Sequence, residues 1–257
     1  MLKQVQQDRG ASGGAGFHRW AMCLSLLALL NPVAVSAQEL PPVSYPPLPA
    51  EAATAEAFLP MGWGIETRTE GDLNGDSKAD LALVLRSQDR ANVIPVEMCG
   101  AELDTNPSIL AILLAKPGGG YRLAVENHAL IPRRENSCQL DGLTAMSVER
   151  GALRFDFERM MSAGGWDMGS TTFKWRWRDG ALRLIGFDRS NVKRNTGAMT
   201  RISINYPTGR AKISTGNIGT DRETVRWKTL RNRRAPTIGE VGDGLTFDPE
   251  GLVSGQP

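Results

Sequence analysis

The sequence predicts an all-β fold, in which about ten antiparallel strands form a meander that is a sandwich or a curled sheet. From Trp63 onward, apolar and polar residues alternate with the period of two that is typical of strands, and Gly and Asp punctuate the alternation. No stretch after Phe58 has the spacing of an amphipathic helix. With 257 residues and 41% hydrophobic content, the chain can bury one sizeable core or at most form two small domains.

Composition divides the chain into consecutive segments. We expect a signal peptide (1–37), an arm rich in Pro and Ala (38–60), a single β domain (61–235, with an N-terminal part at 61–131 and a hairpin part at 143–231) and a C-terminal tail (236–257). Prolines favour extended polyproline II structure, so the arm is either a tether or a segment packed on the surface.

The first segment has the features of a secretory signal. A basic leader precedes the apolar run Ala21–Leu30, and small residues follow at Val35 and Ala37, where a signal peptidase needs them. The apolar run is shorter than the roughly 20 residues that a membrane-spanning helix needs. We therefore predict export to the periplasm or the extracellular space, with cleavage after Ala37 and no membrane span afterwards. A retained membrane anchor is the alternative.

Removal of the leader leaves a chain without net charge. The leader holds three of the 30 Lys and Arg residues and one of the 28 Asp and Glu residues, so 27 of each remain. A neutral chain has no overall field that would attract nucleic acid or an anionic membrane, so we expect neither as a partner. The oligomeric state stays open.

The expected strands are short and are separated by turn residues. They lie at 64–70, 80–86, 108–116, 121–131, the two halves of 143–160, the two halves of 171–188, 199–206, 209–215 and 223–230. The clearest hairpin turns at Asp179 and Gly180, which supply the positive φ angles of a two-residue type I′ turn. That turn would set Trp175 opposite Leu184 and place Trp177 on the same face.

The stretch "DLNGDSKAD" repeats oxygen-bearing side chains at regular positions. Loop positions one, three, five and nine are Asp72, Asn74, Asp76 and Asp80, and Lys78 at position seven offers its backbone carbonyl. Such spacing lets a tight loop gather the hard oxygen donors that Ca²⁺ prefers. The sequence therefore predicts one structural Ca²⁺ site. An Asx-rich turn without an ion is the alternative.

This motif resembles the calcium-binding repeat of the FG-GAP or VCBS type, which occurs in integrin heads and in many secreted bacterial proteins. The resemblance runs from Gly62 to Glu126, and its specific part is "GDLNGDSKADLALVL". It implies that the side chains of Asp72, Asn74, Asp76 and Asp80, together with the main-chain oxygen of Lys78, hold the ion.

The chain departs from the repeat in several ways. Ser77 and Ala79 replace the glycine and proline usual in the loop, and an insertion that contains Cys99 separates the two strand pairs. The sequence contains no second acidic loop of this spacing. Because one blade of a propeller cannot bury its own faces, we expect a local calcium hairpin rather than a closed multi-blade propeller.

Two cysteines, Cys99 and Cys138, remain after signal cleavage. An even number of cysteines in an exported chain favours a disulfide. A bridge that closes a loop of about 40 residues would stabilise the fold by about 4 kcal/mol, less any strain. Two buried thiols are the alternative.

Few residues suggest catalysis. The chain after the leader contains a single histidine, His128, which we expect to be an ordinary strand or turn residue, and it has too few soft ligands for zinc. Asp156 and Glu158 alternate along one strand, as a glycosidase pair would, but a solvated outer face explains them as well.

Two further places have the composition of ligand surfaces. The loop around Trp166 is rich in Gly and Ser, and Arg231, Arg233 and Arg234 form a basic cluster that suits an acidic polymer. A solvated edge that blocks strand addition also explains the basic cluster.

The leading hypothesis is an exported, non-enzymatic protein that binds an envelope protein or glycan. The first alternative is a hydrolase of envelope polysaccharide that uses paired carboxylates. The second alternative is a structural accessory subunit.

Overall fold

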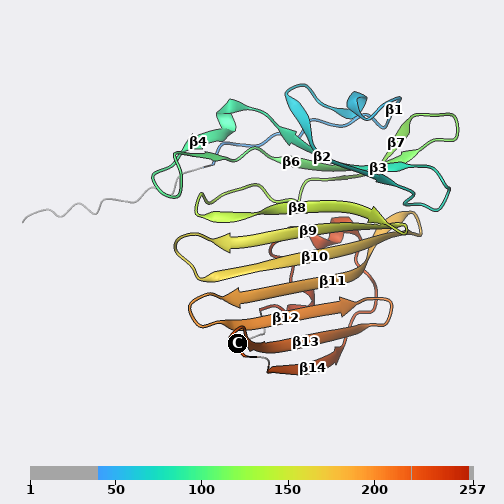
Figure 1. The fold of residues 1–257 in the computed structure, drawn as a ribbon. Coiled ribbons are helices and arrows are strands. Elements are labelled where there is room, and N and C mark those ends of the chain that lie inside the picture. The colour runs from blue at the N-terminus through green and yellow to red at the C-terminus, as the bar shows by residue number, and fades with distance from the viewer. Residues whose placement is uncertain (1–39, 221, 255–257) are drawn as a thin grey trace, which may run out of the picture. The chain divides into compact units, whose positions relative to one another are not determined.

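The computed structural model describes residues 40–220 and 222–254, which form antiparallel sheets (Figure 1). The five-stranded sheet has the order β1-β7-β6-β3-β2 and contains β1 (Glu51–Ala52), β2 (Trp63–Gly71), β3 (Asp80–Ser87), β6 (Ser108–Ala115) and β7 (Tyr121–Asn127). The seven-stranded sheet runs in reverse chain order from β14 to β8 and contains β8 (Gln139–Glu149), β9 (Ala152–Met161), β10 (Asp167–Arg178), β11 (Ala181–Lys193), β12 (Ala198–Asn205), β13 (Arg210–Asn217) and β14 (Glu223–Thr229).

Little else in the described residues is regular. A two-stranded ribbon pairs β4 (Val93–Pro95) with β5 (Glu102–Asp104). One short helix, α1 (Ile238–Val241), and 3-10 turns at Glu56–Phe58, Arg90–Asn92 and Pro249–Gly251 complete the elements. None of these sheets closes on itself. The all-β prediction and the expectation of an open meander rather than a closed propeller are therefore confirmed.

The hairpins of the seven-stranded sheet follow the local turn chemistry. Asp179 and Gly180 have φ angles of 51° and 75°, as the type I′ turn requires. Trp175 lies opposite Leu184, and Trp177 lies opposite Leu182, as the turn predicted. A two-residue loop fixes the register next to it, so these two residues decide which side chains near the turn reach the core. Farther from the turn, a bulge at Ile185 shifts the register.

The two large sheets share one core. Their edge strands β2 and β8 lie side by side (Figure 1), and a Cβ atom on Gly71 would come within 2.6 Å of Cγ1 of Val148. The inner face of the seven-stranded sheet carries fully buried aromatic residues that include Phe155, Phe173 and Phe187. We call its opposite face the outer face, which carries Thr172, Asp188, Ser203 and Lys212 among others.

The arm covers the second face of the five-stranded sheet. Leu48, Ala55 and Phe58 pack on a cluster from β3 and β6, and Phe58 is fully buried. Because the shared core covers the other face, both central strands are buried on two sides, and this explains their continuous apolar sequences. The described part of the arm therefore packs on the surface, which was one of the two expectations.

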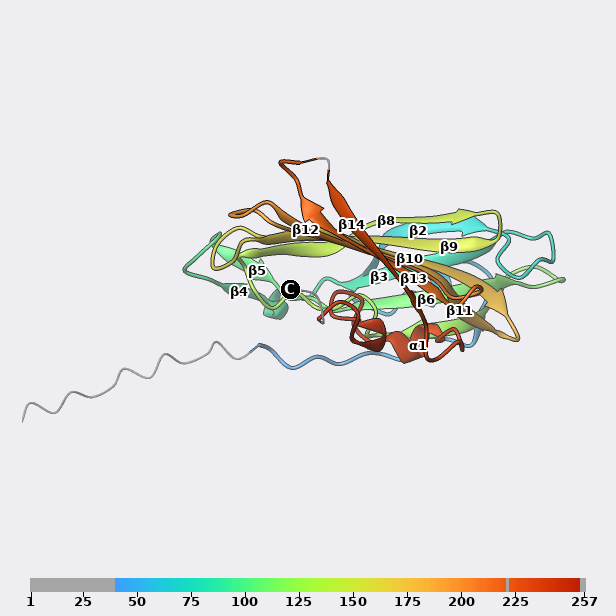
Figure 2. The same cartoon turned by 90° about the horizontal axis from the view of Figure 1, so that it is seen from below.

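The segment expected as a C-terminal tail supplies part of the core. Ile238, Val241, Leu245 and Leu252 are buried against the inner face of the seven-stranded sheet. Figure 2 shows this segment, with α1, on one side of that sheet. The buried Arg189 fastens the segment, because its guanidinium donates to the carbonyl oxygens of Gly244 (3.1 Å) and Leu245 (3.0 Å).

The predicted disulfide is confirmed. Cys99 and Cys138 are bonded, with Cα atoms 4.9 Å apart, and the bridge joins the β4–β5 ribbon to the segment that precedes β8. Among residues 40–220 and 222–254, no helix has the length and apolar character to cross a membrane. The predicted signal peptide lies outside the described residues.

Candidate calcium loop and ligand-binding surfaces

The predicted calcium loop forms the turn of the β2–β3 hairpin. Gly71, the last residue of β2, pairs with Asp80, the first residue of β3. Between them the backbone turns through positive φ angles at Gly75 (85°) and Ser77 (65°). Ser77 thus adopts the left-handed conformation that glycine takes readily and other residues take at a cost.

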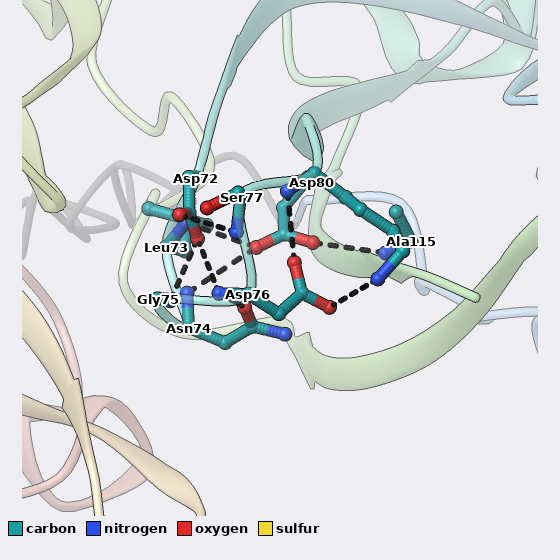
Figure 3. Close-up of polar contacts among 9 residues, drawn as sticks. Asp72, Leu73, Asn74, Gly75, Asp76, Ser77, Asp80 and Ala115 are labelled. Atoms are coloured by element: carbon teal, nitrogen blue, oxygen red, sulfur yellow. Dashed lines mark hydrogen bonds and ion pairs between the residues drawn. The ribbon is translucent and has the colours of Figure 1, made fainter. Parts of the chain in front are cut away.

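Asp72 and Asn74 organise the backbone of the loop (Figure 3). One carboxylate oxygen of Asp72 accepts the N–H of Gly75 at 2.6 Å, and the other accepts the N–H of Ser77 at 2.8 Å. The side-chain oxygen of Asn74 accepts the N–H of Asp76 at 2.9 Å. Asx residues often cap turns in this way, so these two side chains stabilise the turn from within the loop.

Asp80 connects the loop to the rest of the sheet. Its side chain is fully buried, and its Oδ2 accepts the N–H groups of Leu73 (2.9 Å) and Asn74 (3.3 Å). Its Oδ1 accepts the N–H of Ala115 at 2.9 Å, at the end of the neighbouring strand β6. A buried carboxylate needs such donors, so Asp80 has a structural role with or without an ion.

Asp76 is the most exposed of the three loop carboxylates, and its side chain contacts Lys78 of the same loop. Its Oδ1 accepts the N–H of Lys78 at 2.9 Å, and its Oδ2 lies 3.3 Å from Nζ of Lys78. The backbone hydrogen bond from Lys78, aided by its ammonium group, holds the pKa of Asp76 below its usual value. An ion bound here would compete with Lys78 for one oxygen.

The oxygen atoms of the loop are of the kind that Ca²⁺ binds, but their positions suit an ion only in part. Carboxylate, amide and carbonyl oxygens are the hard donors that Ca²⁺ takes, and all of them belong to one short loop. In the described part of the chain, however, no group of three or more His, Cys, Asp or Glu side chains is positioned to hold a metal ion. The carboxylates of Asp72 and Asp80 face backbone N–H groups instead. Calcium binding therefore stays a prediction.

Of the residues considered for catalysis, His128 and Asp156 are engaged in other contacts, and Glu158 is exposed. His128 Nε2 lies 2.9 Å from Glu126 Oε1, and its ring stacks on Tyr45 with centroids 4.1 Å apart. Asp156 accepts two hydrogen bonds from Arg154, at 2.7 and 2.8 Å. Burial raises the pKa of Asp156, but the bonds from Arg154 and Thr172 outweigh burial and lower it overall. A general acid needs a raised pKa, so this environment does not suit one.

The residues expected to form a ligand surface lie at opposite ends of the seven-stranded sheet. Trp166 precedes β10 at the end where Asp167 pairs with Lys193. At the other end, the carbonyl of Gly209 accepts the N–H of Leu230 at 2.8 Å, and Arg231 follows directly. Trp166 and the basic cluster therefore do not form one site.

Each of these surfaces has its own contacts. The guanidinium of Arg194 lies 5.9 Å from the ring centroid of Trp166, which is 59% exposed. Glu250 accepts the backbone N–H of Arg231 at 3.1 Å, and Arg234 pairs with Glu240. The hydrogen bond from the backbone of Thr237, together with Arg234, lowers the pKa of Glu240 to about 2.

The structure reveals a further surface that the sequence did not indicate. A shallow pocket of about 240 Å³ lies on the outer face and spans β10 to β14. It is lined by Ser170, Thr172, Asp188, Arg189, Ser190, Arg201, Ile202, Ser203, Lys212, Ser214 and Glu223. Each of the strands β10 to β13 contributes one or two Ser or Thr residues, which become one surface only when the register is known.

The carboxylates of this outer-face pocket are paired. Asp188 accepts a hydrogen bond from Ser203 Oγ at 2.6 Å and lies 3.3 Å from Nζ of Lys174. Glu223 forms an ion pair with Arg201. The hydroxyl groups and paired charges offer hydrogen-bond donors and acceptors in several directions, and no single charge dominates.

An exposed tryptophan borders the pocket. Trp227 lies opposite Lys212 in the β13–β14 ladder, so both side chains are on the outer face. Trp227 is 57% exposed, and the guanidinium of Arg210 lies 4.6 Å from its ring centroid. A large aromatic ring beside a polar pocket is a common feature of binding sites.

Comparisons with known proteins add no relative. No family model, curated protein or solved structure matches the chain. The resemblance of the loop from Asp72 to Asp80 to a calcium-binding repeat stays a prediction, and the function has to be argued from the residues of each site.

Proposed function

We propose that the protein is an exported, non-enzymatic binding protein that holds an envelope glycan on the outer face of the seven-stranded sheet. In this proposal, the loop from Asp72 to Asp80 is a structural Ca²⁺ site of the FG-GAP or VCBS type that fastens the β2–β3 hairpin. An envelope protein is the other partner class that the sequence favours.

The observation that supports the glycan is the outer-face pocket with Trp227 at its border. Sugars present hydroxyl groups around the ring edge and a less polar ring face. The Ser and Thr hydroxyls, together with Asp188 and Arg201, supply hydrogen bonds to the first, and an exposed indole ring offers a stacking surface to the second. A pocket open to solvent also suits a polymer, which must pass across it.

Binding without turnover agrees with the state of the carboxylates. A glycosidase needs one carboxyl group that holds a proton and a second that is ionised. Asp188 and Glu223 in the pocket are both paired with cations, and Asp156 beside it has a lowered pKa. The lowered pKa of Asp156 makes this carboxyl group unsuited to the role of general acid, which supports binding over hydrolysis at this pocket.

Binding to fragments of peptidoglycan and lipopolysaccharide tests the glycan proposal. We expect one of these fragments to bind, and Trp227→Ala to weaken its binding by about tenfold or more, because stacking on the ring is lost. Trp166→Ala is the matched control, since it removes an equally exposed tryptophan at the far end of the sheet. Equal binding by Trp227→Ala would overturn the proposal, and release of new reducing ends would support the hydrolase.

A calcium titration tests the loop. If Ca²⁺ binds only the folded protein, a tenfold excess over its dissociation constant stabilises the fold by roughly 1.4 kcal/mol. We expect the melting temperature to rise with Ca²⁺, and Asp76→Ala to remove the rise. Glu158→Ala, which removes an exposed carboxylate elsewhere, should keep it. If the melting temperature of the unsubstituted protein does not change at millimolar Ca²⁺, the loop is an Asx-rich turn without an ion.

A further inference from the structure

Strand β14 is an open edge of the seven-stranded sheet. Within the described residues it pairs only with β13, and all seven of its residues are exposed. The β13–β14 ladder is continuous, without a bulge, from Arg210 opposite Thr229 to Gly216 opposite Glu223. Proteins usually shorten, bulge or cover such edges, because their unpaired backbone groups accept a further strand.

The register defines which backbone groups of β14 are available. The N–H of Leu230 donates to the carbonyl of Gly209, directly opposite, at 2.8 Å. Opposed pairs in an antiparallel ladder alternate between hydrogen-bonded and non-bonded, so Lys228 and Arg226 also direct their backbone groups toward β13. Consequently Val225 and Trp227 direct their N–H and C=O groups away from β13, toward the open edge.

The side chains of β14 define the chemistry of a strand that would pair with it. Val225 and Trp227 are on the outer face, where they are 44% and 57% exposed. Arg226 and Lys228 are exposed on the opposite face. An incoming strand with apolar residues on one face and acidic residues on the other complements both sets. Glu223, the only acidic residue of β14, already pairs with Arg201, so the strand has a surplus of positive charge and favours an acidic partner.

A second copy of the chain is a poor partner for this edge. Symmetric antiparallel pairing of two β14 strands about Arg226 sets Arg226 opposite its own copy, and pairing about Trp227 sets Arg226 opposite Lys228. Pairing about Val225 sets Lys228 opposite Arg222. Like charges directly opposite each other destabilise a strand pair.

We propose that β14 is a docking site for an extended protein segment in which acidic and apolar residues alternate, and that this segment binds as an eighth strand of the sheet. Main-chain hydrogen bonds supply affinity in this mode of recognition, and alternate side chains supply specificity. The proposal goes beyond glycan binding and does not depend on it, because it uses the backbone edge of β14 rather than the outer-face pocket.

The test uses a fluorescent peptide of about nine residues in which glutamate alternates with valine, and a matched peptide in which lysine replaces glutamate. We expect the acidic peptide to bind the protein and the basic one not to bind. Raising the salt concentration from about 50 to about 300 mM should weaken binding by about tenfold, because the charges are exposed. Failure of the acidic peptide to bind overturns the proposal.

Two variants separate strand addition from simple charge attraction. Val225→Pro removes an N–H that faces the open edge and leaves the β13 ladder intact, so it should weaken binding by about tenfold or more. Val225→Ala keeps the N–H and should change binding by less than about threefold. Equal binding by Val225→Pro and Val225→Ala overturns the proposal. A dimer that Val225→Pro dissociates would show that the occupant is a second copy, which also overturns it.

Amide hydrogen exchange of the unsubstituted protein keeps the test decisive if Val225→Pro does not fold. The N–H groups of Val225 and Trp227 should exchange quickly alone and at least about tenfold more slowly with the acidic peptide. The N–H groups of Arg226 and Lys228 already pair with β13 and should change little. Protection of both sets alike, or of neither, contradicts strand addition.

Discussion

The two large sheets contact water in different ways, although both are antiparallel. In the five-stranded sheet, Leu83 and Ala82 alternate along β3, yet both are fully buried, because the arm covers one face and the shared core the other. In the seven-stranded sheet only one face is buried, so Phe155 and Phe157 alternate with more exposed residues along β9. The first sheet therefore serves stability, and the second has a free face and a free edge at which recognition can occur.

Removal of the disulfide should have the largest effect on stability, because the bridge links the ribbon between β3 and β6 to the first strand of the seven-stranded sheet. Replacing Cys99 and Cys138 together with serine removes a bridge that spans 39 positions and links the β4–β5 ribbon to the start of β8. Chain entropy predicts a loss of up to about 4 kcal/mol in the free energy of unfolding. Urea denaturation measures it, and reduction of the unsubstituted protein should give a similar value. A loss below about 1 kcal/mol would mean that the bridge does not stabilise the fold through the entropy of the unfolded chain, as the model requires.

Phe58→Ala tests the double cover of the five-stranded sheet. Phe58 belongs to the arm and is fully buried against β3 and β6, so its truncation should cost about 3 kcal/mol or more. Trp166→Ala is the matched control, because it removes an exposed aromatic ring beside the seven-stranded sheet and should cost less than about 1 kcal/mol. Equal losses in thermal or urea unfolding would contradict the contrast between a covered and an open sheet.

The features that could be predicted from the sequence are those set by residues close together in the chain. Asp179 and Gly180 define their own turn, and with it the pairing of Trp175 with Leu184, because a two-residue hairpin leaves no other register. The disulfide followed from a count of cysteines, and the polar loop at Asp72 followed from its spacing.

What the sequence did not predict depends on contacts between distant segments. Nothing local in the arm indicates that Phe58 packs on β3, since that contact needs the sheet first. Ser170, Ser190 and Ser203 form part of one pocket only because three strands align them. The separation of Trp166 from Arg231 was accessible in principle, because successive turns of a meander alternate between the two ends of the sheet.

Alkaline unfolding tests whether water reaches Tyr206 on the covered face of the seven-stranded sheet. Burial first, and the charge of Glu250 second, raise the pKa of Tyr206 to about 12 from an ordinary value of 10.0. An acid whose pKa is raised in the folded state contributes stability that is fully present below its unfolded pKa and declines as the pH rises toward the folded one. The unsubstituted protein should therefore lose about 1 kcal/mol more than Tyr206→Phe between pH 8 and about pH 11. Parallel losses in the two proteins would indicate that water reaches Tyr206.

The smallest effect concerns the turns of the two sheets. In the seven-stranded sheet, Asp179 and Gly180 adopt the positive φ angles that the turn between β10 and β11 requires. In the loop of the five-stranded sheet, Ser77 takes a φ of 65° where the calcium-binding repeat has glycine. Ser77→Gly should therefore raise the free energy of unfolding by about 0.5–1 kcal/mol, because it relieves the left-handed conformation and keeps the N–H that Asp72 accepts.

Ala79→Gly is the control with an expected effect of opposite sign. Ala79 does not have a positive φ, so a glycine there relieves no strain and only adds freedom to the unfolded chain, which lowers the free energy of unfolding. If Ca²⁺ binds the loop, Ser77→Gly should also bind it more tightly, since less of the binding energy is used to hold the strained turn. Melting temperatures of both variants with and without Ca²⁺ measure the two effects together. A stabilisation by Ser77→Gly that is equal in both conditions would mean that the turn is strained for folding alone, and that the loop needs no ion to close the β2–β3 hairpin.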